Sequence, residues 1–182
     1  VVRKLEAIST KDLTDFDENF TLHKIPKFTI PAVTDFAKNN DFNCIVLGDN
    51  TDHITLTHFA TLSCGRPDLA HWYSTDDSTN YSPIAVLRPV RQCLLREIQF
   101  YCKQKQIKYD SSLSPLEKTF KYETDLINSV LSVDNGGMPF AVQKLGEKLP
   151  PFLQNKKCPI CHLPSPNDEI CSFCSAIESC NE

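Results

Sequence analysis

The sequence predicts an α/β fold followed by a small cysteine-rich module. Two short apolar runs, Cys44–Gly48 and Ile84–Leu87, are typical of buried parallel strands, and each precedes a segment with helical periodicity. Near the end of the chain, residues 158–161 and 171–174 each have the pattern Cys-x-x-Cys. A strand followed by a helix, occurring twice, indicates an α/β domain, and paired cysteines indicate a separate metal-binding module.

Helical patterns surround the first apolar run. After Pro31 the stretch Ile30–Asn39 has the spacing of an amphipathic helix. Capping oxygens in Asp49–Asp52 precede a second helical pattern that ends near Gly65. The segment Pro67–Ser82 is rich in Asp, Ser and Thr, and we expect it to be a flexible connection.

The strongest helical periodicity follows the second apolar run. This helix is expected to open at Arg88–Arg91, and the apolar residues of its one face are expected to be core. They are Val90, Leu94, Leu95, Ile98, Tyr101 and Cys102. Further helices are predicted from Ser114 to Val130 and from Pro139 to Leu149, with a break at Asn135–Gly137. We therefore expect an α/β domain over residues 1–150 and a linker with the cysteine-rich module over residues 151–182.

Composition points to a reducing compartment. The chain has 182 residues and nine cysteines, an odd number that argues against a secreted disulfide framework. No apolar run is long enough to span a bilayer and no signal-peptide pattern is present, so we expect a cytoplasmic protein without a membrane partner. The chain begins without methionine, which suggests a fragment. Its net charge of −4 means that nucleic-acid binding would need a local basic patch or a partner subunit.

The two cysteine pairs predict a zinc site. Each pair is expected to form a tight knuckle, and the four thiolates of Cys158, Cys161, Cys171 and Cys174 would fill a tetrahedral zinc shell. A shell closed by four sulfurs is structural. An iron–sulfur cluster, disulfides or a redox thiol pair are the alternatives. His162 is expected to face solvent or to lie outside the ligand set.

The order of several short motifs carries a family resemblance. They are Leu47–Asn50 after a strand, Cys64–Arg66 after a helix, Leu87–Arg91, Leu95–Ile98 with Tyr101, and the terminal cysteine pairs. Over roughly residues 11–176 this order resembles the cytoplasmic tRNA 2-thiolation protein 2 family. That family is a degenerate branch of the PP-loop ATP-pyrophosphatases, so the resemblance implies a Rossmann-like PP-loop domain, partial and degenerate, with a C-terminal zinc ribbon.

The resemblance also implies partners and a reaction. The family is the non-identical partner of a catalytic thiolase subunit, and the heterodimer places sulfur on the wobble uridine, U34, of tRNAs for lysine, glutamate and glutamine. The sulfur comes from a thiocarboxylated ubiquitin-like carrier. Such a chain would be a non-catalytic or co-catalytic subunit, with no catalytic residues of its own.

Departures from an active PP-loop enzyme support that reading. Ser-Gly-Gly, which would cradle ATP phosphates, occurs nowhere in the chain. Gly136–Gly137 follows a predicted helix and is expected to stop it. In thiolases the second active-site segment resembles Gly-His-Asn-x-Asp-Asp. The corresponding segment here, Gly48–His53, lacks the leading histidine. Among the remaining cysteines, Cys93 is the best candidate for a redox role because it lies between Arg91 and Arg96 near a helix start, but such a role is not favoured.

Two groups of basic residues are candidate tRNA contacts. They are Arg88, Arg91 and Arg96 around the second strand-to-helix transition, and Lys156 and Lys157 before the first cysteine pair. The carboxyl ends of parallel strands are where ligands approach an open sheet, although a solvated helix face with ion pairs explains the arginines equally well. Two other functions stay open: a self-sufficient ATP-dependent tRNA thiolase whose phosphate loop lies outside this chain, and a zinc-ribbon interaction module without a tRNA role.

Overall fold

The computed structural model describes residues 34, 37–75, 84–109, 115–133, 137–150, 156–167 and 169–179. Most of the helix predicted over Ile30–Asn39 lies outside these residues. By its internal contacts the chain divides into two compact units, each treated by itself below. The first, which we call the sheet unit, comprises Val1–Val46, Asp76–Leu87 and Leu153–Glu182, and the second, the helical unit, comprises Leu47–Thr75 and Arg88–Phe152.

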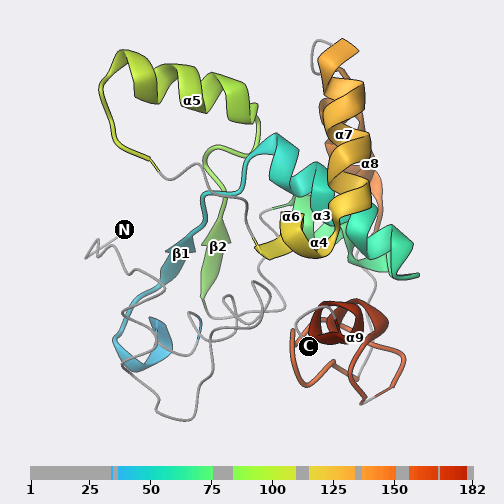
Figure 1. The fold of residues 1–182 in the computed structure, drawn as a ribbon. Helices are drawn as coiled ribbons and strands as arrows, with labels where there is room; N and C mark the ends of the chain where they lie inside the picture. The colour runs from blue at the N-terminus through green and yellow to red at the C-terminus, as the bar shows by residue number, and fades with distance from the viewer. Residues whose placement is uncertain are drawn as a thin grey trace. The chain divides into compact units, whose positions relative to one another are not determined.

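The sheet unit contains two short parallel strands. Strand β1 (Cys44–Val46) pairs with β2 (Ala85–Leu87), with Ile45 opposite Val86 (Figure 1). These two central residues are buried, whereas Val46 is 53% exposed. Both predicted strands are therefore confirmed, and the described fold is mixed α/β and mostly helical. The larger Rossmann-like sheet stays a prediction.

Helix α3 (Thr51–Ser63) begins where the sequence predicts a cap. Asn50 is its N-cap, and the Asn50 side-chain oxygen accepts a hydrogen bond from the His53 backbone N–H at 2.8 Å. The chain leaves the helix at Gly65, whose φ of 69° belongs to the left-handed region that glycine adopts without strain. Both ends of this helix were thus readable from the sequence.

The flexible connection predicted over Pro67–Ser82 is wrong in its first half. This stretch forms the 3-10 helix η2 (Pro67–Leu69) and helix α4 (Ala70–Ser74), while residues 76–82 lie outside the described part. Leu69 is fully buried and Trp72 is 3% exposed. Burial of these two large side chains stabilises a helix in a segment whose polar composition suggested a loop.

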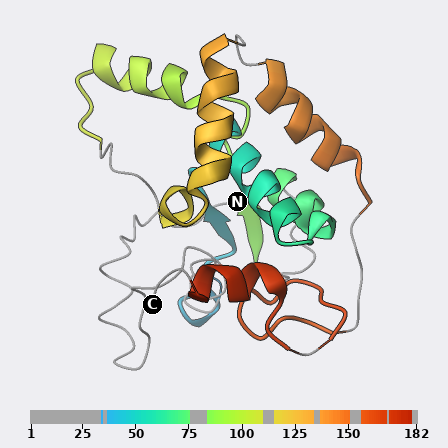
Figure 2. The ribbon, with the colours of Figure 1, turned by 45° about the vertical axis from the view of Figure 1, so that its right-hand side comes forward.

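Three helices form the core of the helical unit. Helix α8 (Gly137–Lys148) packs against both α3 and α4, which also contact each other (Figure 2). At the crossing, a Cβ atom built on Gly146 would lie 2.2 Å from Ser74 Oγ and 2.5 Å from His58 Cε1. Only glycine allows the helices to approach this closely.

The helix predicted to open at Arg88–Arg91 begins later and is not core. Residues 88–94 form turns, and helix α5 spans Leu95–Gln104. No residue of α5 is buried, and Tyr101 is 58% exposed. In both views α5 extends away from α3 and α4 (Figures 1 and 2). Helical periodicity identified the helix, but its predicted core face is only partly covered by the described structure: Leu94 is buried, whereas Leu95 and Tyr101 are exposed.

The predicted helix from Ser114 to Val130 is two helices. Helix α6 (Pro115–Thr119) ends at Phe120, and helix α7 (Lys121–Val133) follows. Phe120 and Ile127 are buried, and α7 packs against α3. A turn at Phe120 lets the aromatic side chain enter the core while α7 continues in a new direction.

Candidate metal centre

The first cysteine pair forms a knuckle closed by backbone hydrogen bonds. The His162 N–H donates to the Cys158 carbonyl at 2.9 Å, and the Cys158 N–H donates to the Leu163 carbonyl at 3.0 Å. An antiparallel bridge between Lys157 and Pro164 closes the base of the turn. Because the backbone bends around residues 158–162, both thiols point to one side, as the Cys-x-x-Cys spacing predicts.

His162 adopts a strained backbone conformation. Its φ is 57°, in the left-handed region that costs a residue with a Cβ roughly 1–2 kcal/mol. Its side chain is exposed, as predicted, and the group of four converging thiols does not include it. The knuckle thus imposes a glycine-like conformation on a residue that is not glycine.

The second cysteine pair does not form a knuckle. Cys171 precedes helix α9 (Ser172–Ser179) and its carbonyl accepts a hydrogen bond from the Ser175 N–H at 2.9 Å, so Cys174 lies in the first turn. The expected ribbon with two knuckles is thus a knuckle followed by a helix. The N-terminal end of a helix carries partial positive charge, which stabilises thiolates placed there.

The four sulfurs converge on one point. All four ligand atoms lie within 4.8 Å of one another; Cys158 Sγ is 3.5 Å from Cys174 Sγ and Cys161 Sγ is 4.0 Å from Cys171 Sγ. A tetrahedral ion with Zn–S bonds of about 2.3 Å would separate its sulfurs by about 3.8 Å. These thiols could therefore bind a metal such as zinc.

The surroundings of the thiols are those of a closed site. All four cysteines are buried, and the Cys171 N–H points at Cys158 Sγ with an N–S distance of 3.4 Å. The hydrogen bond to Cys171, together with burial, raises the pKa of the Cys161 thiol to about 12. Ionisation of the Cys161 thiol in this buried site therefore needs a neutralising cation.

Among the described residues, few side chains other than the cysteines stabilise the cysteine-rich module of residues 156–179. Besides the cysteines, Leu163 and Phe173 are its large fully buried side chains among the described residues. So small an apolar core does not offset the conformational entropy of ordering the loop between the pairs. A bound ion would supply the missing stabilisation.

The candidate tRNA-contact arginines have different environments. Arg88 is 3% exposed, and its guanidinium donates to Asp49 Oδ2 at 2.9 Å and to the Thr75 carbonyl at 2.8 Å. Arg91 donates to the Ser74 carbonyl and pairs with Glu147 at 3.2 Å. These contacts hold loops and helices of the helical unit together. Arg96 is exposed on α5.

The candidate lysines lie on the surface of the metal module. Lys156 and Lys157 are both exposed, and the Lys156 carbonyl accepts a hydrogen bond from the Ser165 N–H at 3.0 Å. Their positions are therefore fixed by the same hairpin that presents Cys158. Whatever holds the four cysteines also orders this basic pair.

The remaining cysteines of the described chain are unremarkable. Cys44, Cys64, Cys93 and Cys102 are half-buried. Cys180 lies outside the described residues. Among the described residues, none of the four half-buried cysteines belongs to a group of possible metal ligands.

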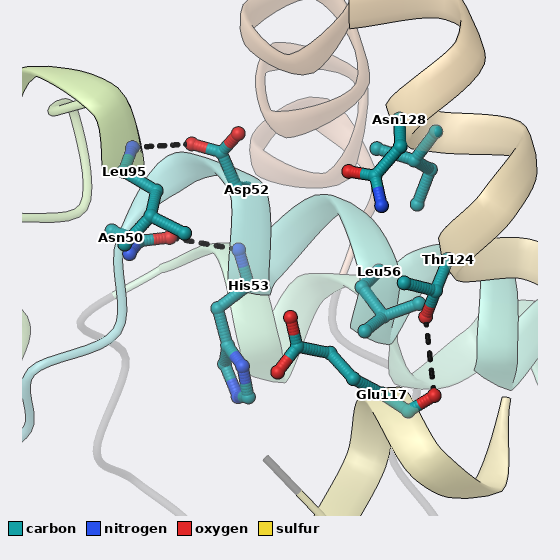
Figure 3. Close-up of a pocket in the computed structure, with 9 residues that line it drawn as sticks. Asn50, Asp52, His53, Leu56, Leu95, Glu117, Thr124 and Asn128 are labelled. Atoms are coloured by element: carbon teal, nitrogen blue, oxygen red, sulfur yellow. Dashed lines mark hydrogen bonds between the residues drawn. The ribbon is translucent and has the colours of Figure 1, made fainter. Parts of the chain in front are cut away.

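A cavity with a mixed polar and apolar lining lies at the start of α3. It has a volume of about 160 Å³ and combines residues of α3 with residues of α6 and α7, which are distant in sequence. Within it, Asp52 accepts a hydrogen bond from the Leu95 N–H, and the carboxylate of Glu117 points toward His53 (Figure 3). The sequence does not predict that Glu117 and Asn128 line this cavity, because no local pattern links them to α3.

Comparison with protein-family models, with curated proteins and with solved structures gives no match. Across the residues that the structure describes, no helix combines the length and the apolar character needed to cross a bilayer. The family resemblance therefore stays a sequence-based prediction, and the four-cysteine cluster is the feature on which sequence and structure agree.

Proposed function

We propose that Cys158, Cys161, Cys171 and Cys174 hold one structural zinc ion. The observation that carries this is the convergence of four buried sulfurs at separations close to those of a tetrahedral single-ion site. Since all four positions are protein sulfur, no open position is left for substrate. An iron–sulfur cluster would place several iron atoms between the thiolates, which suits a tight single-ion site less well.

Metal analysis of the purified chain tests this proposal. We expect one zinc per chain, lost in Cys158→Ser and in Cys171→Ser. Because structural zinc contributes on the order of 10 kcal/mol to folding of such a module, either variant should also leave α9 unfolded. Cys102→Ser, which changes a half-buried cysteine outside the cluster, is the control and should keep its metal. Stoichiometric iron with a visible chromophore, or Cys→Ser variants with normal metal content, would overturn the assignment.

We further propose that this chain is a subunit of a heterodimeric tRNA wobble-uridine 2-thiolation complex. The order of motifs along the chain supports this, together with the metal module at its C-terminal end. In this role the chain shapes the complex and helps to hold tRNA, and the partner thiolase activates the uridine. Sulfur reaches the tRNA from a ubiquitin-like carrier with a thiocarboxylate terminus.

The turn after β1 supports a subunit without a phosphate cradle there. Asn50 already caps α3, and two carboxylates, Asp49 and Asp52, lie at this helix end. Negative charges at a helix N-terminus repel a triphosphate, which would otherwise be favoured there. Arg88 neutralises Asp49 instead of facing a ligand. The described turn is therefore suited to stability and not to ATP binding.

Reconstitution tests the subunit role. The chain co-expressed with a thiolase subunit should purify as a stoichiometric complex and should support thiolation of U34 when ATP and the charged sulfur carrier are added. The isolated chain should not hydrolyse ATP. Turnover of ATP and thiolation by the isolated chain would favour the self-sufficient enzyme. A complex that neither binds nor thiolates tRNA would favour the interaction module.

A further inference from the structure

Helix α5 and the residues directly after it carry an unusual surface. Over residues 95–109 there are four basic residues and one acidic residue, in a chain whose net charge is −4. The same stretch exposes large aromatic side chains: Phe100 is 65%, Tyr101 58% and Tyr109 51% exposed. We call residues 95–109 the α5 segment. Positive charge and exposed rings therefore occur together here.

The aromatic and basic side chains share one face. Phe100 lies four residues after Arg96 and three before Lys103, so these three side chains are neighbours on one side of α5. Arg96 and Lys103 are about 10 Å apart along the helix axis, with the ring between them. Packing against the residues that the structure describes does not explain a phenylalanine on the charged face of this helix, because Phe100 is 65% exposed.

The lysines of the α5 segment are available to a partner. Lys103, Lys105 and Lys108 are exposed, and none forms an ion pair with a described carboxylate. The chain leaves the helix through a turn in which the Ile107 N–H donates to the Cys102 carbonyl at 2.9 Å. Lys108 and Tyr109 follow this turn directly. The basic and aromatic character therefore continues past the helix end.

We propose that the α5 segment is a docking surface for single-stranded RNA. Lysines contact phosphates, and exposed rings stack on unpaired bases, which is the combination that single-strand binders use. Charge complementarity favours RNA over an apolar protein surface, which would not need four cations around the rings. The inference rests on the proposed function only for the identity of the RNA as tRNA. Binding of single-stranded RNA itself is inferred from the exposed rings and the positive charge of the α5 segment.

Binding of a short uridine-rich single-stranded RNA, measured across a salt series, tests the docking surface. In the chain with its metal bound, Lys103→Ala/Lys105→Ala/Lys108→Ala should weaken binding and reduce the slope of log affinity against log salt by about 2, since each single-strand phosphate contact contributes about 0.7. Phe100→Ala should weaken binding about tenfold with an unchanged salt slope, because stacking releases no counterions.

Matched controls come from α6 and α7. Lys118→Ala/Lys121→Ala removes two exposed lysines, and Tyr122→Ala removes a ring that is 77% exposed; neither should alter RNA binding. Thermal melting of all variants should match the parent, because every changed side chain is exposed. RNA affinity that is unchanged in both α5 variants would overturn the proposal. So would loss of thiolase co-purification in Phe100→Ala with RNA affinity retained, since that would make the segment a protein interface.

Failure of the docking surface and failure of the thiolation role are separable. A complex that thiolates tRNA while its α5 variants bind RNA normally refutes only the α5 surface. A chain that binds single-stranded RNA through α5 but forms no thiolation complex refutes only the thiolation role.

Discussion

At the scale of single residues, the knuckle formed by residues 158–162 requires a left-handed backbone conformation at His162, which is unfavourable for a residue with a Cβ. His162 has a positive φ directly after Cys161, and its N–H closes the knuckle on Cys158. Glycine would adopt this conformation without the steric cost of a Cβ. A substitution at His162 can therefore change the backbone strain of the knuckle without changing the four sulfur ligands.

His162→Gly should stabilise the metal-bound module by about 1 kcal/mol, because the strain of the left-handed conformation is relieved. Metal stoichiometry should stay at one ion per chain, since the histidine is exposed and lies outside the four-sulfur group. Thermal melting with metal analysis checks both results. Ile160→Gly, in the same turn, is the control and should not stabilise. Loss of metal in His162→Gly would instead identify the histidine as a ligand.

His58 is a buried titratable group in the helical unit. Its Nε2 lies 2.6 Å from Ser74 Oγ and 3.2 Å from the Ala70 carbonyl oxygen. Removal from water lowers the pKa of His58 below its ordinary value of 6.5, and this effect outweighs hydrogen bonds to the Ala70 and Val142 carbonyls. The folded protein therefore favours the neutral ring.

The free energy of unfolding should fall on acidification because of His58. Above pH 6.5 the ring is neutral in both states, and its contribution to stability is complete. Below pH 6.5 the unfolded chain takes up a proton that the folded chain resists, so stability declines with a limiting slope of about 1.4 kcal/mol per pH unit. Denaturant unfolding from pH 7.5 to 5 measures this slope. His58→Gln should flatten it, and an identical slope in that variant would assign the effect to other groups.

At the scale of elements, α8 approaches α3 and α4 closely at Gly146. Gly146 faces Ser74 and His58 where a Cβ would overlap their atoms. Helix propensity alone would favour alanine at this position by about 1 kcal/mol. Packing overrides propensity here, because neither neighbour can move without breaking the hydrogen bond between them.

Gly146→Ala should therefore destabilise the helical unit, by roughly 1–3 kcal/mol, as overpacking of a close-packed site does. Denaturant unfolding followed by far-ultraviolet circular dichroism measures the change. Leu145→Ala, the neighbouring position at 61% exposure, is the matched control and should change stability by less than about 0.5 kcal/mol. A more stable Gly146→Ala protein would contradict the close approach.

Element boundaries were readable where local chemistry sets them. Asn50 marked the start of α3 and Gly65 marked its end, because capping and left-handed turns depend on neighbouring residues. The helix α4 was missed, since it owes its existence to the burial of Trp72 by other helices. The turn at Phe120 was missed for the same reason: a break that places one ring in the core leaves no local signal.

At the scale of the whole molecule, the proposed binding of tRNA depends on local positive charge, because the chain as a whole is acidic. Lys156 and Lys157 are exposed next to the metal knuckle, whereas Arg88 and Arg91 are held by contacts within the helical unit. Two exposed lysines held by the hairpin that presents Cys158 add local positive charge beside the knuckle. The metal module would thus contribute an electrostatic contact in addition to its own stability.

Charge reversal in Lys156→Glu/Lys157→Glu should lower the tRNA affinity of the assembled complex and flatten its salt dependence by about 1.5 to 2 in the logarithmic slope. Filter binding across a salt series measures both quantities. Metal content and thermal melting should match the parent. Lys121→Glu, on α7, is the control with an unchanged slope. A parent-like slope in the double variant would remove the lysine pair from the RNA surface.

The sequence by itself determined the features that depend on neighbouring residues. The spacing of the cysteines predicted the four-thiol cluster, because both a knuckle and the first turn of a helix bring the two thiols of a Cys-x-x-Cys pair to one side. The apolar runs predicted both strands. Tertiary structure alone decided that no residue of α5 is fully buried, that Arg88 is buried against Asp49, and that the second cysteine pair starts a helix. Periodicity shows which residues share a face, but what covers that face depends on segments far along the chain.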